Sequence, residues 1–192
     1  MAKKNEFKPD KTGSGLLSKL YITPLQRRNI LKWVLYSLIL LVLSLLQDVV
    51  LCKFRLFGAS TELVPCAIIL ICLLEGSQDG CVFTLLAALF YWFSGATLGP
   101  VAMVSITVLS IFVAMFRQSY LQKGFGAAML CTVFTVVVYE MILFLVGAFM
   151  GLTPWNRFGG FLITAGMSLL SAPILYPILL SIASIGGETW KE

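Results

Sequence analysis

Glu140 is the residue whose type and position most directly suggest chemistry, because its carboxyl group stands alone in the apolar run from Phe125 to Met150. A carboxylate inside a membrane indicates a functional site by default, and here it predicts a polar contact with a partner helix or a small ligand. No basic residue lies elsewhere in the predicted hydrocarbon region to pair with it. The structural alternative is a neutral Glu140 that is hydrogen-bonded to a hydroxyl such as that of Ser105, Thr107 or Tyr176.

Glu75 and Asp79 form a second acidic pair and are four positions apart in the sequence. One helical turn would place both carboxylates on the same face, which could hold a cation or a substrate amine. A solvated loop that avoids positive charge explains the same pattern, and the spacing does not decide between the two.

Glycines and prolines mark further candidate contacts. G-x-x-x-G spacing, which lets helices approach closely in lipid, occurs in three pairs: Gly76 with Gly80, Gly95 with Gly99, and Gly147 with Gly151. The first two pairs lie at segment ends and predict helix termination, so only Gly147 and Gly151 predict a helix contact. Pro173 and Pro177 predict a kink that frees two carbonyl groups, either for a ligand or only to bend the helix.

The residues that are missing exclude most enzyme classes. The chain has no histidine, which excludes Ser/His and Cys/His nucleophile pairs and every imidazole metal ligand. The several aspartates that a metal-dependent phosphotransferase needs are also missing. We therefore predict a protein that is not an enzyme and that has no cofactor, no metal and no catalytic residue.

The elements that carry these residues are membrane helices. Of 192 residues, 59% are hydrophobic and 12% are charged, which suits a bilayer rather than water. The sequence predicts an all-α integral membrane protein of about six transmembrane helices, in which the second and third are short and meet in a polar turn recessed into the membrane. Gln47 and Asp48 are expected near the far end of the first helix, where water reaches them. The predicted helices are Trp33–Cys52, Leu63–Leu74, Cys81–Phe93, Leu98–Phe116, Phe125–Met150 and Phe158–Ile185.

Charge predicts the orientation. Eleven of the fourteen Lys and Arg residues fall on the side of the N-terminus, which places both termini in the cytoplasm by the positive-inside rule. Treating Leu63–Phe93 as one broken span is the less favoured alternative. We predict a basic cytoplasmic leader over 1–29 that is partly disordered, with an interfacial turn at Leu16–Tyr21. We also predict a single polytopic membrane domain over 30–186, followed by a short cytoplasmic tail over 187–192. The leader predicts binding to anionic lipids rather than to nucleic acid.

The order of these features over roughly Leu31–Ser181 resembles the MreD family of rod shape-determining proteins. The resemblance rests on Phe57-Gly58, on Pro65 at the start of the second helix, on the two glycine pairs at 76/80 and 95/99, and on the prolines of the last helix. Tyr91 stands where that family often has an acidic residue. The motifs are diffuse, and no site residue is carried over from the family.

The resemblance implies a noncatalytic component of the cell-elongation complex in the bacterial cytoplasmic (inner) membrane. Such a protein helps regulate cell shape and peptidoglycan synthesis through contacts with a single-span MreC-like protein, an actin-like MreB homologue and cell-wall synthases. It is similar in fold to the substrate-binding subunits of energy-coupling-factor transporters, which makes a vitamin-binding subunit the alternative function. Those subunits often carry an Ala-x-x-x-Ala surface on the first helix, whereas Trp33–Leu46 contains no alanine.

Overall fold

The computed structural model describes residues 24–53, 61–76, 78–95, 99–120 and 124–186, and all regular elements in these ranges are helices. The helices are α1 (Pro24–Leu45), α2 (Leu63–Glu75), α3 (Asp79–Phe93), α4 (Pro100–Tyr120), α5 (Phe125–Phe149) and α6 (Phe158–Ala183). A π-helical turn (Leu46–Val50) and a 3-10 turn (Leu51–Lys53) extend α1. The predicted six helices, with the second and third short, are therefore confirmed.

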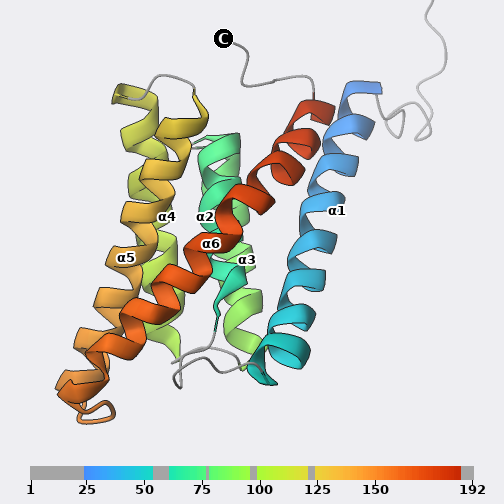
Figure 1. Ribbon diagram of the computed structural model, residues 1–192. Coiled ribbons are helices and arrows are strands. Elements are labelled where there is room, and N and C mark those ends of the chain that lie inside the picture. The colour runs from blue at the N-terminus through green and yellow to red at the C-terminus, as the bar shows by residue number, and fades with distance from the viewer. Residues whose placement is uncertain (1–23, 54–60, 77, 96–98, 121–123, 187–192) are drawn as a thin grey trace, which may run out of the picture.

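Four stretches of these helices are long and apolar enough to cross a membrane: Gln26–Val50, Pro100–Arg117, Phe125–Phe149 and Trp155–Ala183. The protein thus has the helices of a multi-pass membrane protein. Successive helices alternate in direction, so the start of α1 and the end of α6 lie at the same end of the bundle (Figure 1). We call this the terminal end and the other the distal end.

The first helix begins nine residues before the predicted start at Trp33. Pro24 occupies its first position, where the missing N–H costs nothing and the fixed φ angle suits a helix. Arg27, Arg28 and Lys32 therefore belong to α1 rather than to the approach to it. The predicted interfacial turn at Leu16–Tyr21 lies outside the described residues.

Helix α2 is the centre of the bundle, and the other five helices pack around it. Its residues from Leu63 to Leu74 are all buried. A helix that is apolar on every side is stable only when neighbours cover every side, and this segment contains no charged residue before Glu75. At 13 residues it is about 20 Å long, against about 30 Å for the hydrocarbon core. The helix alone is therefore too short to cross such a core.

Gly76 and Gly80 make the tight connection between α2 and α3. Gly76 has a φ angle of +93°, which ends α2 in a conformation that other residues rarely adopt. A Cβ atom on Gly80 would lie 3.0 Å from the carbonyl oxygen and 3.2 Å from the Cα atom of Cys72. The backbones of α2 and α3 therefore approach each other closely at a glycine that the sequence pattern assigned to helix termination.

Within the described bundle, Gly147 faces the loop after α5 and Gly151 faces open space, so a contact of this pair with a partner helix stays a prediction. Gly151 has a φ angle of +71° and terminates α5, while a Cβ atom on Gly147 would meet Thr153 of the loop that follows. The Gly147 carbonyl accepts the N–H groups of Leu152 and Thr153. The pair thus closes the C-terminus of α5, because a spacing of four is shared by helix caps and helix contacts. In α6 the helix continues through Pro173 and Pro177.

Candidate functional site

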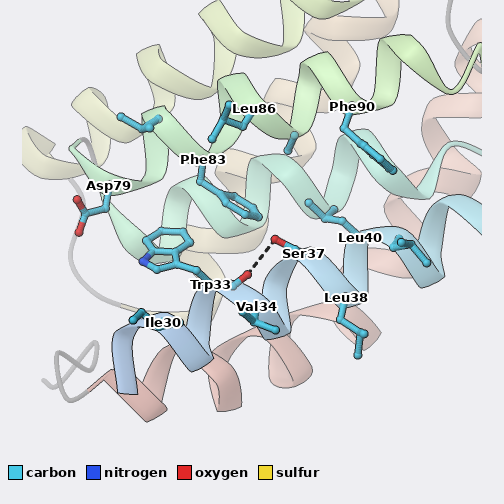
Figure 2. A pocket seen from close by; sticks show the side chains of 13 residues that line it. Ile30, Trp33, Val34, Ser37, Leu38, Leu40, Asp79, Phe83, Leu86 and Phe90 are labelled. Atoms are coloured by element: carbon cyan, nitrogen blue, oxygen red, sulfur yellow. Dashed lines mark hydrogen bonds between the residues drawn. The ribbon is translucent and has the colours of Figure 1, made fainter. Parts of the chain in front are cut away.

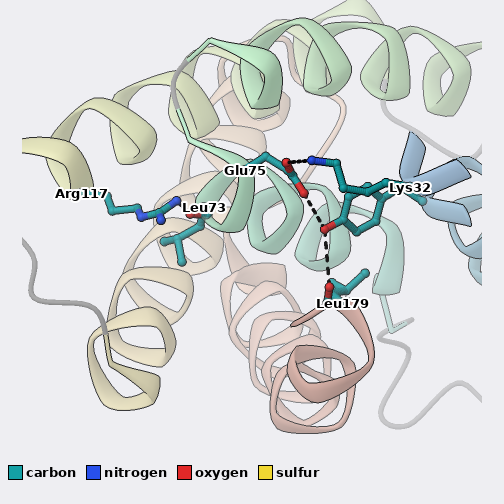
Figure 3. A network of polar contacts seen from close by, with 6 residues as sticks. Lys32, Leu73, Glu75, Arg117 and Leu179 are labelled. Atoms are coloured by element: carbon teal, nitrogen blue, oxygen red, sulfur yellow. Dashed lines mark hydrogen bonds and ion pairs between the residues drawn. The ribbon is translucent and has the colours of Figure 1, made fainter. Parts of the chain in front are cut away.

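A buried ion pair joins α1 to the end of α2. Lys32 Nζ lies 2.6 Å from Glu75 Oε2, and the two side chains are 9% and 8% exposed. The Tyr36 hydroxyl donates to Glu75 Oε1 at 2.8 Å and lies 3.4 Å from the carbonyl oxygen of Leu179 on α6 (Figure 3). Three helices therefore converge on one carboxylate at the terminal end. We call Lys32, Tyr36 and Glu75 the terminal clamp.

Arg117 of α4 binds the backbone at the terminal end of α2. Its guanidinium group donates to the carbonyl oxygen of Leu73, one of the carbonyls that the last turn of a helix leaves without an intrahelical partner (Figure 3). Burial lowers the hydration of the guanidinium group, so this bond keeps it satisfied where water is scarce. The C-terminus of α2 is thus capped by a side chain from a different helix.

The distal end of α2 is capped in a similar way by Gln47. Its Oε1 atom accepts the N–H groups of Leu63 and Val64 at 2.9 and 3.1 Å, and its Nε2 group donates to the Tyr91 hydroxyl at 2.8 Å. The next residue, Pro65, has no N–H group to satisfy. Gln47 is buried, so the prediction that water reaches it was wrong, whereas Asp48 is exposed as predicted. We call Gln47 and Tyr91 the distal clamp.

Glu62 and Glu140 lie beside the distal clamp. The backbone N–H of Glu62 donates to Ser168 Oγ on α6 at 3.0 Å, which places Glu62 between α2 and α6. Glu140 on α5 is 4% exposed. Oε2 of Glu62 and Oε1 of Glu140 are both buried without a hydrogen-bond partner. Burial raises the pKa of the Glu62 carboxyl, which precedes α2.

The predicted hydroxyl partners of Glu140 do not reach its Oε1 atom. The Thr107 hydroxyl donates instead to the carbonyl oxygen of Met103 in its own helix, at 2.8 Å. Tyr176 packs its ring edge-on against Phe125, with ring centroids 5.1 Å apart. The Oε1 atom of Glu140 is therefore left without a hydrogen-bond partner among the described residues.

A groove of about 900 Å³ opens between α1 and α3 (Figure 2). Its walls are apolar, and several of their side chains, including Val34, Leu38 and Leu86, are exposed. Asp79 and Trp33 line one end, and Phe90 lines the other. The single hydroxyl in the wall, that of Ser37, donates to the carbonyl oxygen of Trp33, so it is already satisfied.

The structure separates the predicted acidic pair of Glu75 and Asp79 between the terminal clamp and the α1–α3 groove. Glu75 ends α2 and belongs to the terminal clamp, whereas Asp79 begins α3 and lines the groove. The two carboxylates therefore do not share a helical turn, because the left-handed Gly76 separates their helices. Gly147 and Gly151 lie at the distal end of α5, and Pro173 and Pro177 lie within α6. The structure gathers none of these four residues around Glu140.

Sequence reasoning missed the residues that hold α2, namely Lys32, Tyr36, Gln47 and Glu62. Glu62 had a usable signal, since an acidic residue that directly precedes a helix too short to span must lie close to the hydrocarbon region. Lys32, Tyr36 and Gln47 had no such signal in the sequence, because their partners are distant along the chain. Lys32 and Glu75, for example, are 43 positions apart.

Within the described ranges, no three His, Cys, Asp or Glu residues come together as metal ligands. The cavity beside Glu140 measures about 10 Å³, which is room for at most one water molecule. Comparison of the chain with protein-family models, curated proteins and solved structures finds no match.

Proposed function

We propose that this protein is a noncatalytic membrane component that acts by binding one transmembrane helix of a partner in the α1–α3 groove. The groove is the observation that carries the proposal. It extends from Ile30 to Leu41 along α1, which is about 16 Å or three helical turns. Its exposed apolar walls match the van der Waals packing that drives helix association in lipid.

Asp79 favours a helix over a lipid chain as the occupant. Its exposed carboxylate stands at the terminal end of the groove, beside Ile30 and Trp33. We place this end in the cytoplasm, because most Lys and Arg residues of the chain lie on that side. A single-span protein carries its own Lys and Arg residues at the cytoplasmic end, where they would meet this carboxylate.

The resemblance to the MreD family supplies the identity of the partner. On that basis the occupant is the transmembrane helix of an MreC-like protein, and the complex regulates cell shape and peptidoglycan synthesis in the bacterial inner membrane. The MreB-like protein and the cell-wall synthases would join through the same complex. The vitamin-binding alternative has less support, because the cavity at Glu140 is too small for a vitamin and the α1–α3 groove offers few polar groups to bind one, with its Ser37 hydroxyl already bonded to Trp33.

Site-specific photocrosslinking in the native bacterium tests the groove. A photoreactive residue at Leu86, which is 59% exposed in the groove, should crosslink to the single-span partner. The same residue at Leu170 on α6, which is 73% exposed outside the groove, should crosslink to it far less. Asp79→Asn should weaken the crosslink from Leu86. Equal crosslinking from the two positions would contradict a partner helix in the groove.

Depletion of the protein separates the two functions. Loss of a cell-elongation component should make the cells round or swollen. Cells that keep their shape but require an added vitamin, together with a vitamin that co-purifies at one molecule per chain, would support the transport subunit instead.

A further inference from the structure

The terminal clamp and the groove meet at Trp33. This residue lines the groove at its terminal end and directly follows Lys32 of the clamp in α1. The Lys32 Nζ atom lies 5.0 Å from the centroid of the Trp33 ring, within the range of a cation–π contact, and the same atom pairs with Glu75. Trp33 is therefore both a part of the groove wall and a neighbour of the buried ion pair.

Ring contacts connect the clamp to the opposite wall of the groove. Phe83 lines the groove from α3, and the centroids of its ring and the Trp33 ring are 5.1 Å apart (Figure 2). The Tyr36 ring lies 5.8 Å from that of Trp33 and 6.0 Å from that of Phe83, all within the range of packed aromatic pairs. Tyr36 is fully buried, and its hydroxyl donates to Glu75. Three packed rings thus lead from the Glu75 carboxylate to both walls of the groove.

The clamp fixes the two α1 side chains that contact the Trp33 ring. Glu75 holds Lys32 at 2.6 Å and the Tyr36 hydroxyl at 2.8 Å, one on each carboxylate oxygen. Trp33 itself is only partly buried, and it donates no side-chain hydrogen bond to the clamp among those that the structure shows. Its position therefore depends on packing against neighbours that Glu75 holds.

We propose that the terminal clamp holds Trp33 in the position that the partner helix requires, which makes Lys32, Tyr36 and Glu75 positioning residues for the groove. This inference rests on the proposed function and adds to it a link between the clamp and the affinity for the partner. A side chain that is already ordered spares the complex the entropy cost of ordering it, so loss of the clamp should weaken binding about 2- to 10-fold. Because such coupling is reciprocal, the bound partner strengthens the clamp by the same factor.

Nuclear magnetic resonance of the purified protein in lipid, without any partner, tests whether the clamp positions Trp33. The side-chain N–H signals of the tryptophans are recorded, and Trp33→Phe identifies the signal of Trp33. Glu75→Gln changes no atom that contacts the Trp33 ring, yet it should shift that signal and lower its order parameter. The signal of Trp155, at the distal end, should stay unchanged.

Tyr36→Phe is the milder variant, since it keeps the ring and removes only the hydroxyl that binds Glu75. It should change the Trp33 signal in the same direction and keeps the test decisive if Glu75→Gln does not fold. Leu143→Ala is the control for a general loss of stability, because Leu143 is buried in α5, away from the groove. A Trp33 signal that Tyr36→Phe leaves in place, or that Leu143→Ala moves equally, would overturn the inference.

Photocrosslinking from Leu86 then tests the effect on the partner. At matched protein levels, Glu75→Gln and Tyr36→Phe should lower the yield of the crosslink several-fold, whereas Leu143→Ala should not change it. Equal yields in wild type and in the two clamp variants would overturn the role of the clamp and leave the partner helix in the groove. A wild-type protein that forms no crosslink from Leu86 would overturn both proposals.

Discussion

The terminal clamp shows how a lysine and a glutamate can both be buried in a membrane domain. Each would be costly alone in hydrocarbon, and each is satisfied by the other at 2.6 Å, with the Tyr36 hydroxyl on the second carboxylate oxygen. The sequence places Lys32 at the edge of a basic leader, where binding to anionic lipids was the natural expectation. Its burial instead makes it a structural residue.

The clamp predicts a double-mutant cycle. Lys32→Met should leave Glu75 buried and unpaired, and should lower the free energy of unfolding by about 3–5 kcal/mol. Glu75→Gln should also destabilise, since it leaves Lys32 without its counter-ion. The double variant Lys32→Met with Glu75→Gln should recover much of the loss, because neither charge remains.

Unfolding in mixed detergent micelles measures all three variants, and Arg28→Ala is the matched control because Arg28 is an exposed basic residue one turn earlier in α1. Losses that simply add in the double variant would show that the ion pair contributes nothing to stability.

At the scale of elements, α2 explains why so much of the fold could be predicted and why the candidate site could not. Lengths of apolar runs fix the helices, so the short α2 and α3 follow directly from the runs at 63–74 and 81–93. Which residues cap α2 depends on helices that arrive from far along the chain. Gln47, Arg117 and Ser168 come from three different segments, and no local pattern links them to Leu63 or Leu73.

The glycine pairs illustrate the same limit. Spacing alone predicted a helix contact at Gly147 and Gly151 and helix ends at Gly76 and Gly80. Within the chain, the structure places a close helix approach at Gly80, where a Cβ atom would meet the backbone of Cys72 on α2. A glycine's role is decided by what faces it, which the spacing does not contain.

Gly80 therefore predicts a specific loss of stability. Gly80→Ala should place a methyl group against the backbone of Cys72 and force α2 and α3 apart, at a cost on the order of 1–3 kcal/mol. Gly166→Ala in α6 is the matched control, since nothing lies within 4 Å of its added Cβ atom, and it should be neutral or slightly stabilising. Thermal unfolding in detergent compares the two. Equal stability of both variants would mean that α2 and α3 are free to adjust.

At the scale of the whole molecule, the alternating helices predict that both chain ends emerge on one side of the membrane. The start of α1 and the end of α6 share the terminal end of the bundle (Figure 1). The distribution of Lys and Arg assigns this end to the cytoplasm. A C-terminal fusion to a fluorescent protein that folds only in the cytoplasm should therefore be bright.

The complementary fusion to alkaline phosphatase, which is active only outside the cytoplasm, should be inactive at the C-terminus and active when inserted after Leu152 at the distal end of α5. Phosphatase activity at the C-terminus would contradict the orientation and would move Asp79 to the outer surface.

The burial of α2 also constrains how the chain is made. Lys32 leaves the ribosome long before Glu75, and Ser168, which binds the backbone at Glu62, is synthesised more than a hundred residues after it. Until α6 has entered the bilayer, one flank of α2 has lipid where its last neighbour will pack, and the backbone N–H of Glu62 lacks its acceptor on Ser168. Release of the nascent chain from the insertion machinery before α6 is complete would leave α2 exposed, so truncated chains that end before residue 168 should be substrates for membrane proteases.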